Sequence, residues 1–163
     1  MTDIPSLAGD AVQARLTAVE GLPAEIWRNR GRMGVWKEIA IGNPDAGFAA
    51  INVMDGDARA TEWMLAHPDM EVEVEQELLI DFLVYHPKDA DRTALYRAGL
   101  QKITDAILPP GETGKRERTL GGLVDEIELE RVERQGLVLD VTPHLIGASL
   151  VFRFSFTAGT VLG

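Results

Sequence analysis

The stretch MEVEVEQELLIDFLVYHP, from Met70 to Pro87, combines a row of carboxylates with a long hydrophobic segment. Side chains in a β-strand alternate between its two faces, so residues two apart share a face. One face of this segment would be apolar, interrupted only by Gln76. The other would be acidic in its first half and partly buried in its second half. The acidic row consists of Glu71, Glu73, Glu75 and Glu77. The pattern predicts one long strand that ends at Pro87 and has one face in the protein core.

The composition favours one soluble globular domain that spans residues 1–163. The chain is 45% hydrophobic and 26% charged, which suits a protein with a single core. Its formal net charge of −10 argues against general binding to nucleic acids or anionic membranes. The chain has no cysteine, which excludes disulfides and thiol catalysis and fits a reducing cytoplasm. No signal peptide or apolar run of membrane-spanning length is present in the sequence.

Helices and strands are expected on both sides of this strand. Asp10 could cap a helix that ends at Gly21, and apolar residues at helical spacing predict a long helix over residues 89–108. Other expected elements are a strand around Ile26 and Trp27, a short apolar run at 35–41, a strand over 48–54 that ends at the turn Asp55-Gly56-Asp57, a short helix over 120–127, an alternating segment over 127–140, and a final strand over 147–160. In the final strand, Leu150, Phe152, Phe154 and Phe156 are predicted to point inward and Val151, Arg153, Ser155 and Thr157 outward. The fold class is therefore α+β, a mostly antiparallel β-sheet with two main helices packed on one face.

The sequence contains no clear motif for catalysis, metal binding or phosphate binding. Neighbouring glutamates on one strand lie about 6–7 Å apart, too far to share a metal ion without further ligands. The histidines (His67, His86 and His144) are scattered, and no serine lies in a nucleophile elbow. The loop GETGKR lacks the spacing of a phosphate-binding loop. We expect no enzymatic activity, no catalytic or metal-binding residues and no cofactor.

Two basic clusters stand out in this acidic chain. The first, RNRGR, contains Arg28, Arg30 and Arg32, and it could be a solvated turn or a contact between subunits. The second lies in the polar loop from Pro109 to Thr119. Its basic residues, which could meet the acidic surface of a partner, are Lys115, Arg116 and Arg118. The loop itself is expected to be mobile and to become ordered on assembly, as is the irregular segment 35–68.

The order of these elements resembles that of the tail terminator (tail completion) proteins of long-tailed bacteriophages and gene-transfer particles. The first part of the resemblance is an amino-terminal helix followed by AEIWRNRGRM. The second part is a strand ending in LLIDFLVYHP, the helix ALYRAGLQKITDAIL, the element LGGLVDEIELERVE and the final strand LVFRFSFT. Together they cover most of the chain, although residues 35–68 and the loop 109–119 match poorly.

This resemblance implies a structural protein of the virion tail that is assembled in the cytoplasm of the host. Such proteins form a ring of six copies at the head-proximal end of the tail tube. The implied partners are further copies of the chain, the tail tube protein and the head–tail connector or stopper protein, while DNA passes through the lumen without specific binding. The alternatives are another head–tail joining, neck or tube component, and a small enzymatic or ligand-binding domain. The glutamate row could face the lumen, a subunit interface or solvent.

Overall fold

The computed structural model describes residues 4–22, 24–30, 48–59, 72–133 and 145–158. These residues form two helices and five strands. In chain order the elements are α1 (Ile4–Thr17), β1 (Ala24–Arg28), β2 (Phe48–Arg59), β3 (Val72–Tyr85), α4 (Asp89–Ile107), β4 (Glu126–Glu133) and β5 (Leu145–Ala158). Neither helix in the described part is long and apolar enough to cross a membrane.

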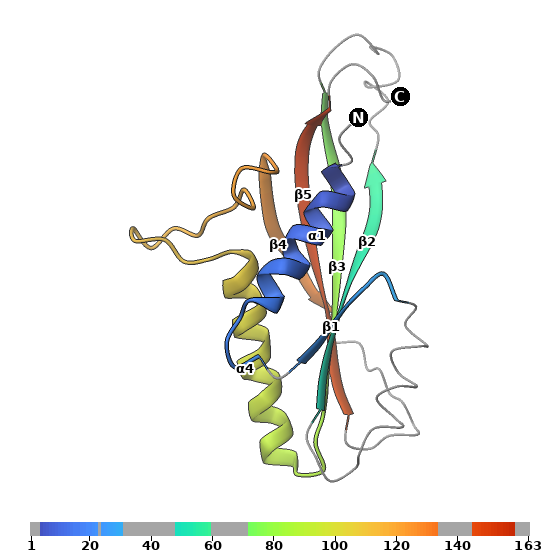
Figure 1. Ribbon diagram of the computed structural model, residues 1–163, viewed down its shortest axis with the longest axis vertical. Helices are drawn as coiled ribbons and strands as arrows, with labels where there is room; N and C mark the ends of the chain where they lie inside the picture. Colours follow the sequence, from blue (N-terminus) through green and yellow to red (C-terminus); the bar gives the residue numbers. More distant parts are fainter. Residues whose placement is uncertain (1–3, 23, 31–47, 60–71, 134–144, 159–163) are drawn as a thin grey trace.

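The five strands form one sheet in the order β1-β2-β3-β5-β4 (Figure 1). β1 pairs with β2 in parallel, and every other neighbouring pair is antiparallel. The two 14-residue strands β3 and β5 lie side by side near the centre, where Val72 pairs with Ala158 and Tyr85 pairs with Leu145. The α+β class and the long strand predicted from the sequence are therefore confirmed.

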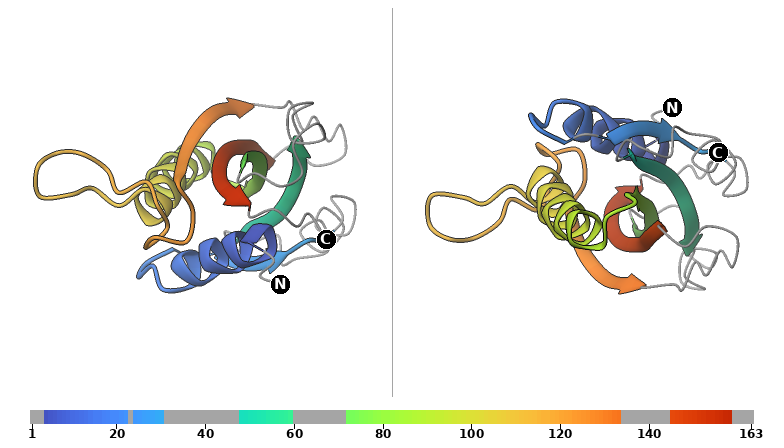
Figure 2. Two further views of the ribbon diagram at one scale, coloured as in Figure 1. Left: turned by 90° about the horizontal axis from the view of Figure 1, so that it is seen from above. Right: turned by 90° about the horizontal axis from the view of Figure 1, so that it is seen from below.

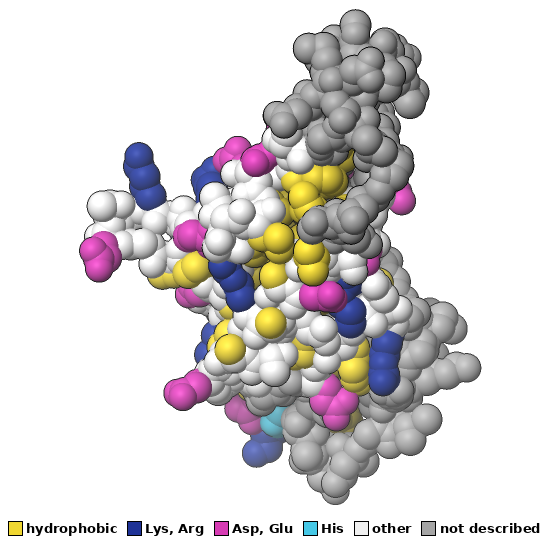
Figure 3. All heavy atoms as spheres, turned by 45° about the horizontal axis from the view of Figure 1, so that its top comes forward, with side chains coloured by type: hydrophobic (Ala, Val, Ile, Leu, Met, Phe, Trp, Pro, Cys, Tyr) yellow, Lys and Arg dark blue, Asp and Glu magenta, His cyan; other side chains and the backbone are white. Residues whose placement is uncertain are grey.

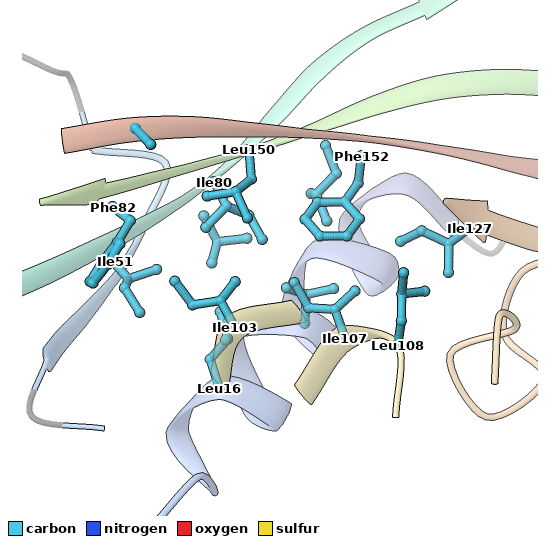
Figure 4. Packing of buried hydrophobic residues seen from close by; sticks show 14 of the residues in the cluster. Leu16, Ile51, Ile80, Phe82, Ile103, Ile107, Leu108, Ile127, Leu150 and Phe152 are labelled. Carbon is cyan, nitrogen blue, oxygen red and sulfur yellow. The ribbon is translucent and has the colours of Figure 1, made fainter. Parts of the chain in front are cut away.

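Both helices cover the same face of the sheet, and the hydrophobic core lies between the two layers. Figure 4 shows Leu16 of α1 and Ile103 and Ile107 of α4 facing Ile80 and Phe152 of the sheet. All five side chains are at most 1% exposed. Burying a side chain of this size contributes about 1.5–3 kcal/mol relative to leaving it in water, so this layer is the main source of stability. The helices therefore leave the opposite face of the sheet uncovered.

The amino-terminal helix begins earlier than the sequence predicted. Asp10 was expected at the N-cap, but α1 starts at Ile4 and Asp10 lies within it. The buried stripe of Ala8, Val12 and Leu16 has a spacing of four residues, so it already includes the turn before Asp10. The apolar stripe therefore indicates the start of this helix better than the presence of an aspartate, which is a common capping residue.

The expected turn at Asp55-Gly56-Asp57 is also wrong, because β2 continues through it to Arg59. The register with β3 shifts between Asp55 and Ala58, which marks a β-bulge. A Cβ atom at Gly56 would lie 2.8 Å from the backbone oxygen of Glu77. Glycine is therefore needed here for the close approach of β2 to β3, rather than to end the strand.

The segment after α4 differs from the short helix that was expected over residues 120–127. Leu120, Gly121 and Gly122 have φ angles of 49°, 72° and 88°, so LGGLV forms turns and not the short helix that was predicted. The preceding loop has a defined backbone with an antiparallel bridge between Pro110 and Arg116. Whether its order changes on assembly stays a prediction. The expected element at 35–41 lies outside the described residues.

Candidate functional site: a charged face of the sheet

The acidic row of β3 lies on the face of the sheet that the helices leave uncovered. Glu73 and Glu75 are exposed and Glu77 is partly buried, while Val74, Gln76 and Leu78 on the opposite face are buried. The predicted alternation is thus confirmed for the part of the row that the structure describes. Glu71 lies outside the described residues.

The neighbouring strands extend this acidic surface. The register places Glu75 beside Ser155 of β5 and Ser155 beside Glu126 of β4. In the same way, Glu77 lies beside Arg153, and Arg153 beside Glu128. We call this surface the charged sheet face. It consists of Glu73, Glu75, Glu77, Glu126, Glu128, Glu130, Arg131, Glu133 and Arg153. Because the glutamates far outnumber the arginines, the face is strongly negative.

Two arginines, Arg131 of β4 and Arg153 of β5, link glutamates of β3 and β4. Arg153 approaches Glu130 at 2.6 Å and Glu75 at 3.8 Å. Arg131 lies 2.7 Å from Glu133, 3.0 Å from Glu130 and 3.8 Å from Glu77. A hydrogen bond to Glu133 and the nearby carboxylates raise the pKa of Arg131 above its usual value. These pairs fix the side chains of the face, although solvated ion pairs of this kind contribute little to stability.

The second half of the same sheet face is buried and polar. Asn52, Asp81 and Ser149 are neighbours across β2, β3 and β5, and each is at most 3% exposed. Ser149 Oγ donates a hydrogen bond of 2.5 Å to Asp81 Oδ1. Asn52 Nδ2 donates to the backbone oxygen of Arg30 at 2.6 Å, and Asn52 Oδ1 accepts from the Arg30 backbone nitrogen. The hydrogen bonds offset the cost of burying these polar groups. Val151 lies on this outward face, as predicted, and it is buried there at 1% exposed.

The described residues contain no group of three or more acidic or histidine side chains placed to hold a metal ion. Of the three histidines, only His86 is described, and it lies 3.9 Å from the exposed Asp91. A small cavity of about 80 Å³ lies between α4 and the sheet, lined largely by apolar side chains such as Leu22 and Leu95. The Nζ of Lys102 at its edge donates to the backbone oxygen of Gly21. This cavity does not gather the polar groups that catalysis or ligand recognition requires.

The first basic cluster makes contacts within the chain. Arg28 donates to Asp10 at 3.2 Å and to Asp55 at 2.7 Å, so it links α1 to β2. The guanidinium of Arg30 lies 4.8 Å from the ring centroid of Trp27. Arg32 lies outside the described residues. These internal contacts do not test whether the cluster also meets a second subunit.

The basic residues of the second cluster have different surroundings. Arg116 donates to Asp105 at 2.7 Å and to the backbone oxygen of Leu108 at 2.8 Å. The hydrogen bonds from Arg116 and then Gln101 lower the pKa of Asp105. Arg118 forms an exposed ion pair of 3.1 Å with Glu126. Lys115 is exposed at the tip of the loop.

Glu117, which was not among the residues predicted from the sequence, joins the loop to α1. Its carboxylate accepts hydrogen bonds from Arg15, from the backbone and hydroxyl of Thr119, and from the backbone of Gly121. Burial raises the pKa of Glu117, but the hydrogen bonds from Thr119, Gly121 and Arg15 outweigh this effect and lower the pKa to about 2. The sequence shows that Thr119 and the Gly121-Gly122 pair follow closely after Glu117, which could have indicated the local hydrogen bonds. It could not indicate the pairing with Arg15, because Arg15 is distant in sequence.

The comparisons with known proteins found similarity to solved structures. No protein-family model and no curated protein matches the chain. Among solved structures, the chain is similar to one chain of the structure described as "Virion of native gene transfer agent (GTA) particle". The sequences are 17% identical, the similarity covers 92% of this chain and 94% of the other, and the TM-score is 0.48. At this level the similarity does not establish a family or a function.

Proposed function

We propose that this chain is a tail terminator, a structural protein that forms a ring at the head-proximal end of a phage-like tail tube. The observation that carries the proposal is the charged sheet face, where Glu73, Glu75 and Glu77 line up opposite the helical layer. The order of elements, which resembles that of tail terminators along most of the sequence, also supports it. The ring ends polymerisation of the tube protein and offers a surface to the head connector.

The charged sheet face has a physical role in such a ring. DNA that passes through a channel must not be held by its walls, and carboxylates repel the phosphate backbone. In this arrangement the helices α1 and α4 lie outside and the charged sheet face lines the channel. The alternative within the same function is that this face meets basic groups of a neighbouring subunit, since opposite surfaces meet in a heterologous ring. Internal pairing of Arg28 and Arg116 leaves fewer strong cations for that alternative.

Ring formation is tested by measuring the native mass of the purified protein by light scattering and by negative-stain imaging. The expected result is a ring of about six copies with a central hole. Its addition to polymerising tail tube protein should then stop elongation and give shorter tubes. A chain that stays monomeric in the presence of tube protein and leaves tube length unchanged would contradict the proposal.

The role of the charge is tested by reversing it. A ring carrying Glu73→Lys, Glu75→Lys and Glu77→Lys should retain double-stranded DNA at low salt and release it as salt rises, because phosphate contacts depend strongly on salt. The wild-type ring should retain none.

The matched control changes the net charge equally on exposed residues outside the charged sheet face, with Glu20→Lys, Asp91→Lys and Glu112→Lys. This variant should behave like the wild type. Equal DNA retention by both triple variants would show that the position of the charge does not matter, and it would remove the lumen assignment.

A further inference from the structure

A β-bulge in β4 places two consecutive side chains on the charged sheet face. β4 is an edge strand of the sheet and lies next to β5 (Figure 2). Its register with β5 shifts between Leu129 and Arg131, so Glu130 is the extra residue of the bulge. In a regular strand Glu130 and Arg131 would point to opposite faces. Here Glu130 contacts Arg153, and Arg131 lies 3.8 Å from Glu77, so both side chains lie on the face that carries the glutamates of β3.

The carboxylate of Glu130 lies between the two arginines of this face. Its Oε1 accepts a hydrogen bond from Arg153 at 2.6 Å, and its Oε2 accepts one from Arg131 at 3.0 Å. The neighbouring carboxylates contact one arginine each. Glu75 lies 3.8 Å from Arg153, and Glu133 lies 2.7 Å from Arg131. Among the described residues, Glu130 is therefore the carboxylate that pairs with both cations, and the bulge puts it in that place.

An arginine without a carboxylate beside it on this face would be able to hold DNA. A guanidinium group binds a phosphate through two parallel hydrogen bonds. The side chains of Arg131 and Arg153 are 44% and 26% exposed, so both can be reached from solvent. On the side of the molecule shown in Figure 3, too, basic side chains lie among acidic ones. On the charged sheet face, Glu130 occupies N–H groups of both guanidinium groups that a phosphate would otherwise use.

We propose that Glu130 is a positioning residue that keeps Arg131 and Arg153 paired and so prevents them from binding the phosphates of DNA in the channel. This inference rests on the proposed function, in which the charged sheet face lines the channel. A phosphate must displace a carboxylate that is tethered beside the guanidinium group and has a high effective concentration there. Arg153 depends most on Glu130, because its other carboxylate partner in the described residues, Glu75, lies 3.8 Å away.

The pairing is tested on the chain itself, whether or not it is assembled. Phenylglyoxal modifies guanidinium groups, and mass spectrometry of the peptides gives the rate at each arginine. In Glu130→Ala, Arg153 should react about twofold to fivefold faster than in the wild type, the range expected for the loss of one solvated ion pair. The matched variant is Glu128→Ala, an exposed glutamate of the same strand that is not among the carboxylates paired with Arg153 in the described residues. Equal rates at Arg153 in the two variants would overturn the proposal.

The consequence for DNA is tested on assembled rings at low salt, after light scattering has shown that each variant still assembles. The Glu130→Ala ring should retain at least about tenfold more double-stranded DNA than the Glu128→Ala ring, because the freed arginines of several copies act on one duplex and their effects multiply. Both variants lower the negative charge equally, so a difference between them reports the arginines.

Adding Arg131→Gln and Arg153→Gln to Glu130→Ala should remove most of this retention, since the groups that bind phosphate are then gone. Equal retention by the two single variants, or retention that persists without the arginines, would overturn the proposal and leave the ring intact. A wild-type chain that forms no ring would instead contradict the proposed function.

Discussion

The hydrogen bonds around Glu117 predict a measurable dependence of stability on pH. The ordinary pKa of this glutamate is 4.5, and in the folded protein it is about 2. Each pKa unit corresponds to about 1.4 kcal/mol, so the full difference would correspond to about 3 kcal/mol in a site shielded from water. The side chain is 34% exposed, and solvent screening reduces this contribution to about 1–2 kcal/mol.

The sign follows from the lowered pKa. The folded state binds the proton more weakly than the unfolded state, so the contribution is fully present above about pH 4.5 and is lost as the pH falls toward 2. Urea denaturation of the wild type and of Glu117→Gln should therefore differ by about 1–2 kcal/mol at pH 7 and converge at low pH. Glutamine retains one acceptor oxygen and nearly the same volume, so the variant removes mainly the charge.

Glu112→Gln, in the exposed part of the same loop, is the matched control, and it should change the free energy of unfolding by less than about 0.5 kcal/mol. If Glu117→Gln were as stable as the wild type at pH 7, the carboxylate would not stabilise the contact between the loop and α1. A difference that stayed constant down to pH 2 would instead assign the loss to packing and refute the electrostatic reasoning.

Three further changes test the packing of the fold, each by urea denaturation. Gly99→Ala should destabilise the protein by about 1–3 kcal/mol, because the added Cβ would lie 2.2 Å from the Phe82 ring and the core must shift. Unchanged stability would show that the Phe82 ring can move away without cost. Phe152→Ala should cost about 3–5 kcal/mol because this side chain is fully buried between the layers, and a cost below 1 kcal/mol would contradict that placement. Arg28→Ala should cost about 1–3 kcal/mol by removing the ion pairs with Asp10 and Asp55 that link α1 to β2, whereas a neutral result would show that these pairs do not stabilise the fold.

The sequence predicted best those elements whose own periodicity defines them. β3 has an alternating pattern along nearly its whole length, and α4 has apolar residues at helical spacing with Asp89 in its first turn, so both were placed within one or two residues. The errors occurred at residues whose type is compatible with two different structural roles. Gly56 suggested a turn, but it permits a bulge within a strand, and Asp10 suggested a helix cap, but it pairs with Arg28 inside a helix.

The candidate site could be predicted only in part. The acidic row follows from alternation along one strand, but the charged sheet face also needs the order of the strands, which places β4 beside β5 and brings Arg131 close to Glu77. Local pattern carries no information on such pairing between strands distant in sequence. The same limit applies to Arg15 and Glu117, which are separated by 102 residues.

The most direct test of the central claim is a cryo-electron microscopy reconstruction of the purified protein in its assembled state. The account predicts a ring of about six copies in which Glu73, Glu75 and Glu77 face the central channel and α1 and α4 lie on the outside. A ring whose channel is lined by the helices, or an assembly with no channel, would contradict it.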